Sequence, residues 1–142
     1  MRTSRFIHND LAYRAGEPRV FLPFEDRRRN MEDLLRFGTV LTIFPSSVSW
    51  QLDGFVDARD FSEAVRNVFR VHQYNFARDF VVLAGDPLVI ALTLAAAASI
   101  DLARQVTALK WDRHPCPQCR RYGGCEHGPG VGAYLRIPLS IP

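Results

Sequence analysis

Hydrophobic positions along this chain follow two spacings, one typical of buried strands and the other typical of helices. The β-branched apolar runs Thr39–Phe44 and Phe80–Ala84 predict two buried strands. Between them, Phe61–Val71 has apolar residues at i, i+4, i+7 and i+8, which predicts an amphipathic helix. The segment Leu88–Ser99 is almost wholly apolar and rich in alanine, so we expect a helix buried against the sheet.

The last part of the chain predicts two more strands. Apolar and polar residues alternate over Val106–Trp111 and again over Ala133–Ile141, where Pro138 is tolerated if the strand lies at an edge. The order strand, helix, strand, helix, strand, strand predicts an α/β fold. We expect a Rossmann-like, three-layer arrangement around a mainly parallel sheet of about four strands, with an antiparallel C-terminal edge strand.

The first part of the chain has no sustained period of either kind, because glycine and proline interrupt its aromatics and arginines. We expect residues 1–36 to form an N-terminal arm that packs on the domain and includes a short helix near Asn30–Arg36. Residues 37–142 are expected to form a single α/β domain, since 142 residues with 47% hydrophobic content can bury one core.

All three cysteines fall in one short segment, together with one of the four histidines. The Cys-x2-Cys spacing lets two thiolates converge on one ion, and a following Cys-x-His can complete a tetrahedron. We therefore predict a structural zinc site in loop 113–132 of the last hairpin, because four protein ligands leave no open position for catalysis. The predicted ligands are Cys116, Cys119, Cys125 and His127, with His114 as the alternative nitrogen ligand.

Basic and aromatic residues in the same loop are candidate contacts to nucleic acid. Arg120 and Arg121 could hold phosphate, and Tyr122 could stack on a base. The alternative is that these residues solvate a compact loop. The run Arg27–Arg29 is a second candidate for an acidic partner, although acids beside it favour a solvated segment. The net charge of +3 permits nucleic-acid contact without requiring it.

A predicted strand gives way to a predicted helix at Gly85 and Asp86, a position at which many α/β proteins bind ligands. Together with Lys110, near the end of the next strand, these residues could line a crevice for a nucleotide-like small molecule. The competing interpretation makes Asp86 the helix N-cap and Pro87 the first helical residue. The phosphate-binding glycine patterns are missing here, and we find no catalytic set of residues in the sequence.

Cysteine content and hydropathy bear on location and partners. Three cysteines cannot all close into disulfides, which favours a reducing, cytoplasmic setting. The apolar stretch Pro87–Ile100 is shorter than the roughly 20 residues that a bilayer requires, so we expect no membrane span. The expected partner is a protein or a nucleic acid. A homo-oligomer, in which the aromatic arm crosses to a neighbour, is a further alternative.

Three short motifs lie within residues 78–139: Leu83-Ala84-Gly85-Asp86-Pro87 before an alanine-rich helix, Leu109-Lys110-Trp111-Asp112-Arg113, and a final strand that contains Tyr134. Together they resemble small uncharacterised α/β proteins of bacteriophages and mobile elements. The resemblance implies an accessory protein of a phage or mobile element and supplies no catalytic residues. We therefore expect a non-enzymatic binding or assembly module. The alternative is a small-molecule binding protein or enzyme that uses the crevice at Gly85, Asp86 and Lys110.

Overall fold

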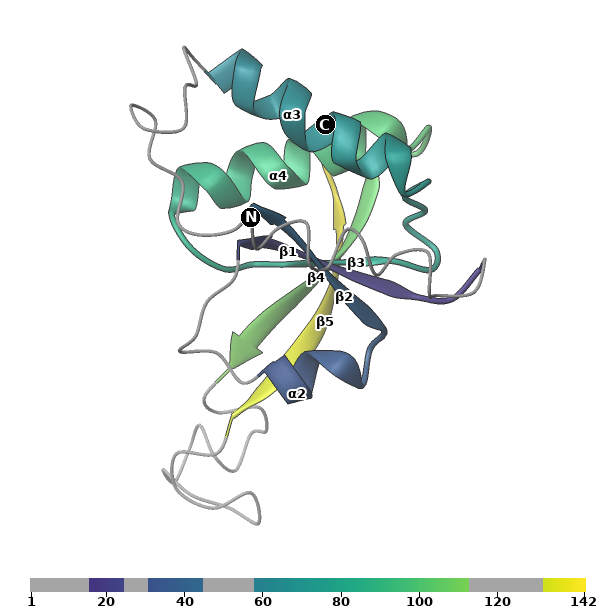
Figure 1. Cartoon of the computed structure of the whole chain (residues 1–142), viewed down its shortest axis with the longest axis vertical. Helices are drawn as coiled ribbons and strands as arrows, with labels where there is room; N and C mark the ends of the chain where they lie inside the picture. The colour runs from purple at the N-terminus through teal and green to yellow at the C-terminus, as the bar shows by residue number, and fades with distance from the viewer. Residues whose placement is uncertain (1–15, 25–30, 45–57, 113–131) are drawn as a thin grey trace.

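A five-stranded sheet organises the chain (Figure 1). The computed structural model describes residues 16–24, 31–44, 58–112 and 132–142. In chain order, the elements are β1 (Arg19–Phe24), α2 (Met31–Leu35), β2 (Thr39–Phe44), α3 (Ala58–Val71), β3 (Phe80–Val82), α4 (Pro87–Ile100), β4 (Gln105–Asp112) and β5 (Ala133–Ser140). Within these residues, we find no helix with the length and apolar character to cross a membrane.

The strands lie in the order β2-β1-β3-β4-β5. Neighbours from β2 to β4 are parallel, whereas β5 returns antiparallel beside β4 at one edge. Helices α3 and α4 pack together on one face of the sheet, and α2 lies on the other face (Figure 1). These features confirm the predicted α/β fold with a mainly parallel sheet and an antiparallel C-terminal edge strand. The chain adds β2 on one side of β1 and then crosses over to add β3 and β4 on the other side. The direction in which strands are added therefore reverses between β1 and β3.

The sheet has five strands, not the four or so that we predicted, because Arg19–Phe24 forms a central strand. The sequence analysis places this segment within the N-terminal arm, because glycine and proline interrupt its apolar pattern. The Pro18 carbonyl points toward β2, because it accepts a hydrogen bond from the Thr39 N–H. Backbone groups of successive residues point to opposite sides of a strand, so the Pro23 nitrogen points toward β3. The registered pairs between β1 and β3 end at Phe21, and the N–H that Pro23 lacks therefore interrupts no bond between them.

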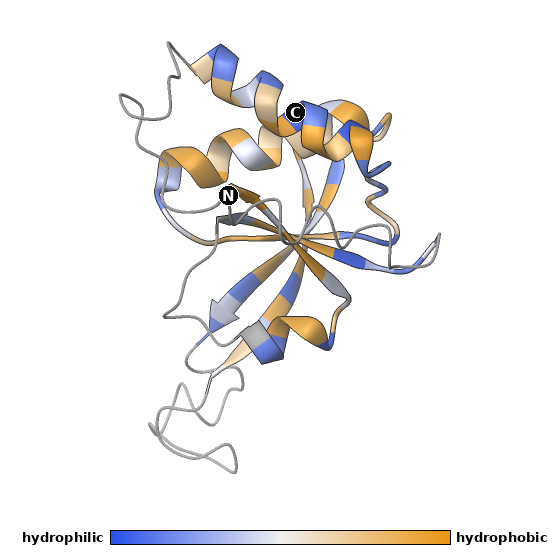
Figure 2. Cartoon of the chain, viewed as in Figure 1, coloured by the Kyte–Doolittle hydropathy of each residue, from blue (hydrophilic) through white to orange (hydrophobic). Residues whose placement is uncertain are grey.

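Two apolar clusters join the layers. The larger cluster lies between the sheet and helices α3 and α4, where the rings of Phe21 and Phe69 meet edge-on with centroids 4.9 Å apart. The smaller cluster lies on the α2 face and includes Leu34 and Phe37. Figure 2 shows hydrophobic residues over most of α4, whose Ala96, Ala97 and Ala98 are fully buried. The helix predicted over Leu88–Ser99 is thereby confirmed, but it is buried on one side only, since Leu88, Ala91 and Ala95 are exposed.

A buried ion pair joins the amino ends of β1 and β3. The Arg19 guanidinium donates to the two Asp79 carboxylate oxygens at 3.2 and 3.0 Å, and the Arg19 backbone N–H donates to the same carboxylate at 3.1 Å. Arg78 and the backbone N–H of Asn75 add further hydrogen bonds. Burial by itself raises the pKa of Asp79, but these donors outweigh it and hold the pKa below its ordinary value. The pair fastens the two central strands together.

Strands β4 and β5 form a regular hairpin with eight registered pairs, from Gln105 opposite Ser140 to Asp112 opposite Ala133. Just beyond it, the Ile141 N–H donates to the Arg104 carbonyl at 2.9 Å. Because backbone groups alternate sides along a strand, the nitrogen of Pro138 faces the free edge. An edge that lacks a donor at this point resists pairing with another strand. The predicted place of Pro138 in an edge strand is confirmed.

Candidate functional site

Gly85 and Asp86 connect the end of β3 to α4, as the sequence predicts. Gly85 has a φ of +98°, which favours glycine. Asp86 is the N-cap of α4, because its side chain accepts a hydrogen bond from the Leu88 N–H at 2.8 Å, and Pro87 follows as the first helical residue. The capping interpretation is thus confirmed. The Asp86 carboxylate is exposed, yet one of its oxygens is already engaged by the helix.

Lys110 is exposed on β4, one strand away from Gly85 and Asp86. The ends of β3 and β4 lie side by side, because the Leu83 N–H donates to the Leu109 carbonyl at 2.9 Å. All three candidate crevice residues therefore lie toward the carboxyl edge of the parallel strands. Open α/β sheets bind ligands at this edge, where the strand order reverses. The fold brings Gly85 and Asp86 to that point and leaves Lys110 one strand farther along.

Replacing Asp86 with alanine is expected to lower the free energy of unfolding by about 1 kcal/mol, because the Leu88 N–H loses its acceptor. Asp86→Asn keeps an oxygen in the same place and is expected to stay within a few tenths of a kcal/mol of the wild type. Urea denaturation followed by circular dichroism measures both values. Equal losses in the two variants would show that the carboxylate charge, not the cap, stabilises the helix.

The predicted metal ligands Cys116, Cys119, Cys125 and His127 lie outside the described residues, as do His114 and the candidate nucleic-acid contacts Arg120, Arg121 and Tyr122. Across residues 16–24, 31–44, 58–112 and 132–142, no three His, Cys, Asp or Glu side chains are grouped so as to hold a metal ion. The chain enters the cysteine loop after Asp112, at the carboxyl end of β4. Zinc binding in that loop stays a prediction.

Aromatic and basic side chains gather on the side of the β4–β5 hairpin that faces the α2 layer. We call Phe37, Phe80, Trp111, Tyr134 and Arg136 the hairpin face. The guanidinium carbon of Arg136 lies 5.2 Å from the ring centroid of Phe37 and 5.4 Å from that of Phe80, within cation–π range. The two rings meet edge-on, with centroids 5.6 Å apart. Arg136 is exposed while Phe80 and Trp111 are half-buried, so solvent reaches all three.

Trp111 and Tyr134 are opposite each other in the β4–β5 register, and their ring centroids lie 5.0 Å apart. Trp111 thus packs against the edge strand. Gly132 allows the close fit, since a Cβ on this residue would lie 2.5 Å from Cζ2 of Trp111. The aromatic pair is therefore held at the end of the hairpin from which the cysteine loop departs.

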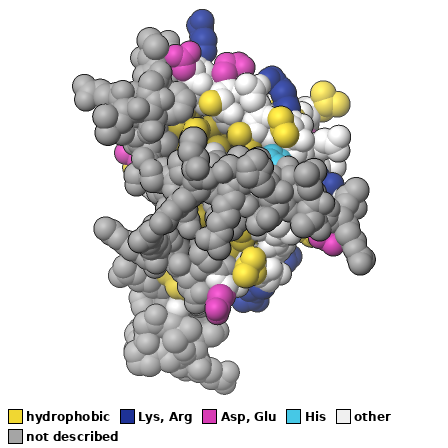
Figure 3. All heavy atoms as spheres, in the orientation of Figure 1, with side chains coloured by type: hydrophobic (Ala, Val, Ile, Leu, Met, Phe, Trp, Pro, Cys, Tyr) yellow, Lys and Arg dark blue, Asp and Glu magenta, His cyan; other side chains and the backbone are white. Residues whose placement is uncertain are grey.

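The hairpin face carries positive charge and hydrogen-bonding groups without acidic residues from its two strands. The β4 and β5 residues that share this side of the sheet are Gln105, Thr107, Leu109, Trp111, Tyr134, Arg136, Pro138 and Ser140. On the face of the molecule shown in Figure 3, by contrast, the described Lys and Arg side chains are dispersed and lie among Asp and Glu. The hairpin face thus suits an anionic ligand that also offers flat, aromatic groups.

The sequence analysis did not identify Arg136, Phe37 or Phe80 as site residues. A signal was available for Arg136, because the alternation over Ala133–Ile141 places it with Tyr134 on the side opposite the apolar residues. Phe37 and Phe80 come from separate segments of the chain, and the strand order brings them beside Arg136.

Comparison of the chain with protein-family models, with curated proteins and with solved structures finds no match. The fold, the hairpin face and the carboxyl edge of the sheet are therefore the grounds on which a function is assigned.

Proposed function

We propose that this protein is a non-enzymatic binding module that holds single-stranded nucleic acid on the hairpin face. The observation that carries this proposal is the exposed Arg136 guanidinium over the rings of Phe37 and Phe80, with Trp111 farther along the same side. Proteins bind single strands by stacking bases on aromatic rings and by directing arginines to the phosphates. The hairpin face offers both groups on a sheet, where their spacing is fixed.

A single strand suits this hairpin better than a β-strand added by a protein partner. The free edge of β5 presents no donor at Pro138, which disfavours continuous main-chain pairing. On the hairpin face, by contrast, Arg136 is exposed and Phe80 and Trp111 are half-buried, so a ligand can reach these three side chains, whereas Phe37 and Tyr134 are buried. A protein partner is therefore the less favoured of the two predicted partners.

The cysteine loop extends the same surface in this proposal. The described residues next to this loop are Asp112 and Gly132, and both lie beside the Trp111–Tyr134 pair. A structural zinc would be held by Cys116, Cys119, Cys125 and His127, or by His114 in place of His127. Arg120, Arg121 and Tyr122 would then meet the strand next to Trp111.

Binding of a labelled oligothymidylate, measured by fluorescence anisotropy at several salt concentrations, tests the proposal. We expect affinity to fall with salt, and the Arg136→Gln variant to reduce the slope of log K against log salt by about 0.7, the value for one phosphate contact on a single strand. Arg59→Gln is the matched control, because Arg59 is an exposed arginine on α3. Absence of binding at low salt, or equal losses in both variants, would contradict the proposal.

Native mass spectrometry of the untagged protein tests the zinc loop separately. We expect one zinc ion per chain and its loss in the Cys116→Ser variant, because three ligands hold the ion less tightly than four. The same spectrum reports whether the chain is a monomer or an oligomer. A metal-free wild-type protein would remove the loop from the proposal and leave the hairpin face standing.

A nucleotide-like small molecule at the carboxyl edge is the second candidate function, and the reversal of strand order beside Gly85 favours it. In this second candidate function, the sheet binds its ligand as Rossmann-like sheets do, with Asp86 and Lys110 as ligand contacts. Thermal shifts with a panel of nucleosides and nucleotides test it. Shifts that are lost in Asp86→Asn, which preserves the cap, but kept in Arg136→Gln would favour the crevice over the hairpin face.

The chain's place among accessory proteins of bacteriophages and mobile elements stays a prediction, as do its cytoplasmic location and any homo-oligomer. Sedimentation of the purified protein tests the predicted homo-oligomer, and a monomer would contradict that prediction.

A further inference from the structure

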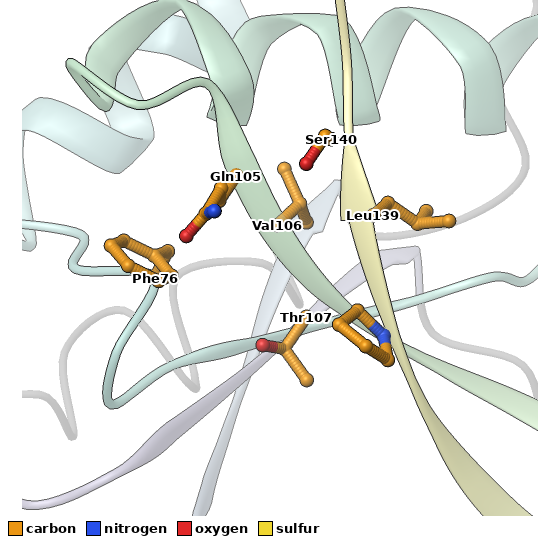
Figure 4. A pocket seen from close by; sticks show the side chains of 7 residues that line it. Phe76, Gln105, Val106, Thr107, Leu139 and Ser140 are labelled. Atoms are coloured by element: carbon orange, nitrogen blue, oxygen red, sulfur yellow. The ribbon is translucent and has the colours of Figure 1, made fainter.

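We infer that a hollow beside the first residues of β4 is a binding pocket for a nucleobase. The hollow lies at the end of the hairpin away from the cysteine loop and has a volume of about 330 Å³. That volume is at the lower end of the range for small-molecule sites, about 300–1,000 Å³. Its lining includes Phe76, Gln105, Thr107, Pro138 and Ser140 (Figure 4).

The hollow exists because neighbouring strands differ in length. β3 has three residues and pairs with β4 at Val81 and Val82, opposite Ala108 and Leu109, whereas β4 has eight residues and begins at Gln105. The first residues of β4 therefore run beyond the end of this ladder. Phe76 belongs to the connection between α3 and β3, and it lies beside this part of β4. The hollow is thus a consequence of the strand lengths and their register.

The side chains around the hollow suit the chemistry of a base. Figure 4 shows Gln105 reaching toward Phe76, with the Thr107 hydroxyl turned to the same side and Leu139 pointing away. Within the described part of the chain, no hydrogen bond engages the side-chain amide of Gln105 or the hydroxyls of Thr107 and Ser140. An amide and hydroxyls can both donate to and accept from the edge of a base, while the half-buried Phe76 ring offers a stacking surface.

Arg136 supplies a cation at a distance that a nucleotide can span. It lies on the same side of β5 as Pro138 and two residues away, which is about 7 Å along a strand. Among the described residues that line the hollow, there is no Asp or Glu. A base in the hollow can therefore direct its phosphate toward Arg136. This step rests on the proposed function of the hairpin face, whereas the base contacts at Gln105 and Thr107 do not.

The base can belong to a free nucleotide or to a single strand, and amide NMR spectra of labelled protein distinguish the two. The probes are adenosine monophosphate, thymidine monophosphate and a short oligothymidylate. We expect a bound probe to shift the Gln105 side-chain amide signals, and Gln105→Ala or Thr107→Val to weaken binding about tenfold, as expected for a lost hydrogen bond to a base. Asn67→Ala is the control, because it removes an exposed amide from α3.

Each outcome decides the inference. Shifts with a mononucleotide identify a free nucleotide as the ligand, and shifts with the oligonucleotide alone identify a base of a single strand. Oligonucleotide binding that leaves the Gln105 amide unmoved, and that survives Gln105→Ala, overturns the pocket while the proposed function stands. A mononucleotide that shifts Gln105 while the oligonucleotide does not bind overturns the proposed function and keeps the pocket. No response to any probe overturns both.

Discussion

Replacing Asp79 with alanine is expected to lower the free energy of unfolding by about 3–5 kcal/mol, because the variant removes the carboxylate that balances the charge of the buried Arg19 guanidinium. The Arg19 side chain is only 3% exposed, so bulk water does not solvate its charge. The backbone N–H groups of Arg19 and Asn75 also lose their acceptor. This loss is comparable with the whole stability of many domains, about 5–15 kcal/mol. Urea denaturation followed by circular dichroism measures it.

A double variant separates the charge effect from packing. Arg19→Met with Asp79→Leu removes both charges, and we expect it to recover part of the stability that Asp79→Ala loses, because replacing a buried pair with apolar side chains is often neutral. A double variant that is no more stable than Asp79→Ala would show that the unbalanced charge of the guanidinium is not the cause.

The same pair makes stability depend on acid pH. The pKa of Asp79 is lower in the folded protein than in the unfolded chain, where it is about 4, so the unfolded chain binds this proton first as pH falls. The contribution of Asp79 to stability is therefore complete above about pH 4 and is lost as pH falls through the folded pKa. Asp79→Asn lacks this titration, and we expect its stability to change less with pH in this range. Parallel pH profiles of the two proteins would contradict the assignment.

Replacing Gly38 with alanine is expected to cost about 2–4 kcal/mol, from steric overlap together with an unfavourable backbone conformation. A Cβ at this position would lie 2.3 Å from the Pro18 carbonyl oxygen, and φ is +155°. The same oxygen accepts the Thr39 N–H at 3.1 Å, at the point where β1 and β2 begin to pair. The substitution therefore pushes apart the amino ends of two neighbouring strands. Thermal or urea denaturation measures the effect.

Gly16→Ala provides the matched control for Gly38→Ala. Gly16 also has a positive φ, of +90°, but no atom of the described residues beyond its chain neighbours lies within 4 Å of the position that its Cβ would occupy. We expect a loss of about 1 kcal/mol there, since only the conformational preference of glycine is affected. A loss at Gly38 no larger than the loss at Gly16 would show that the close approach to Pro18 is unimportant.

The helices and most strands could be predicted because the arrangement of apolar residues along each segment reports burial directly. The predicted Thr39–Phe44 coincides with β2, and the predicted Phe61–Val71 and Leu88–Ser99 fall within α3 and α4. The cap at Asp86 could also be predicted, because it depends on neighbouring residues alone. Local patterns of this kind need no knowledge of the rest of the fold.

The central strand β1 and the hairpin face depend on long-range pairing, which no local pattern reports. From the sequence alone, Pro23 indicates a break in a strand. In the structure, the ladder between β1 and β3 ends at Phe21, so the missing N–H of Pro23 interrupts no hydrogen bond there. From the sequence alone, Arg136 is indistinguishable from other exposed arginines, and only the sheet shows that it lies over Phe37 and Phe80. The hollow beside Gln105 likewise arises from the short β3, a difference in strand length that apolar runs do not reveal.

Photo-crosslinking to a thiouridine-containing oligonucleotide, followed by mapping of the crosslinked peptides, tests most directly whether the hairpin face holds a single strand. We predict crosslinks at Trp111 and in the β5 peptide that contains Tyr134, and a reduced yield at both in the Arg136→Gln variant. Crosslinks confined to α3 and α4, or no crosslink at a salt concentration where the oligonucleotide is bound, would contradict the account.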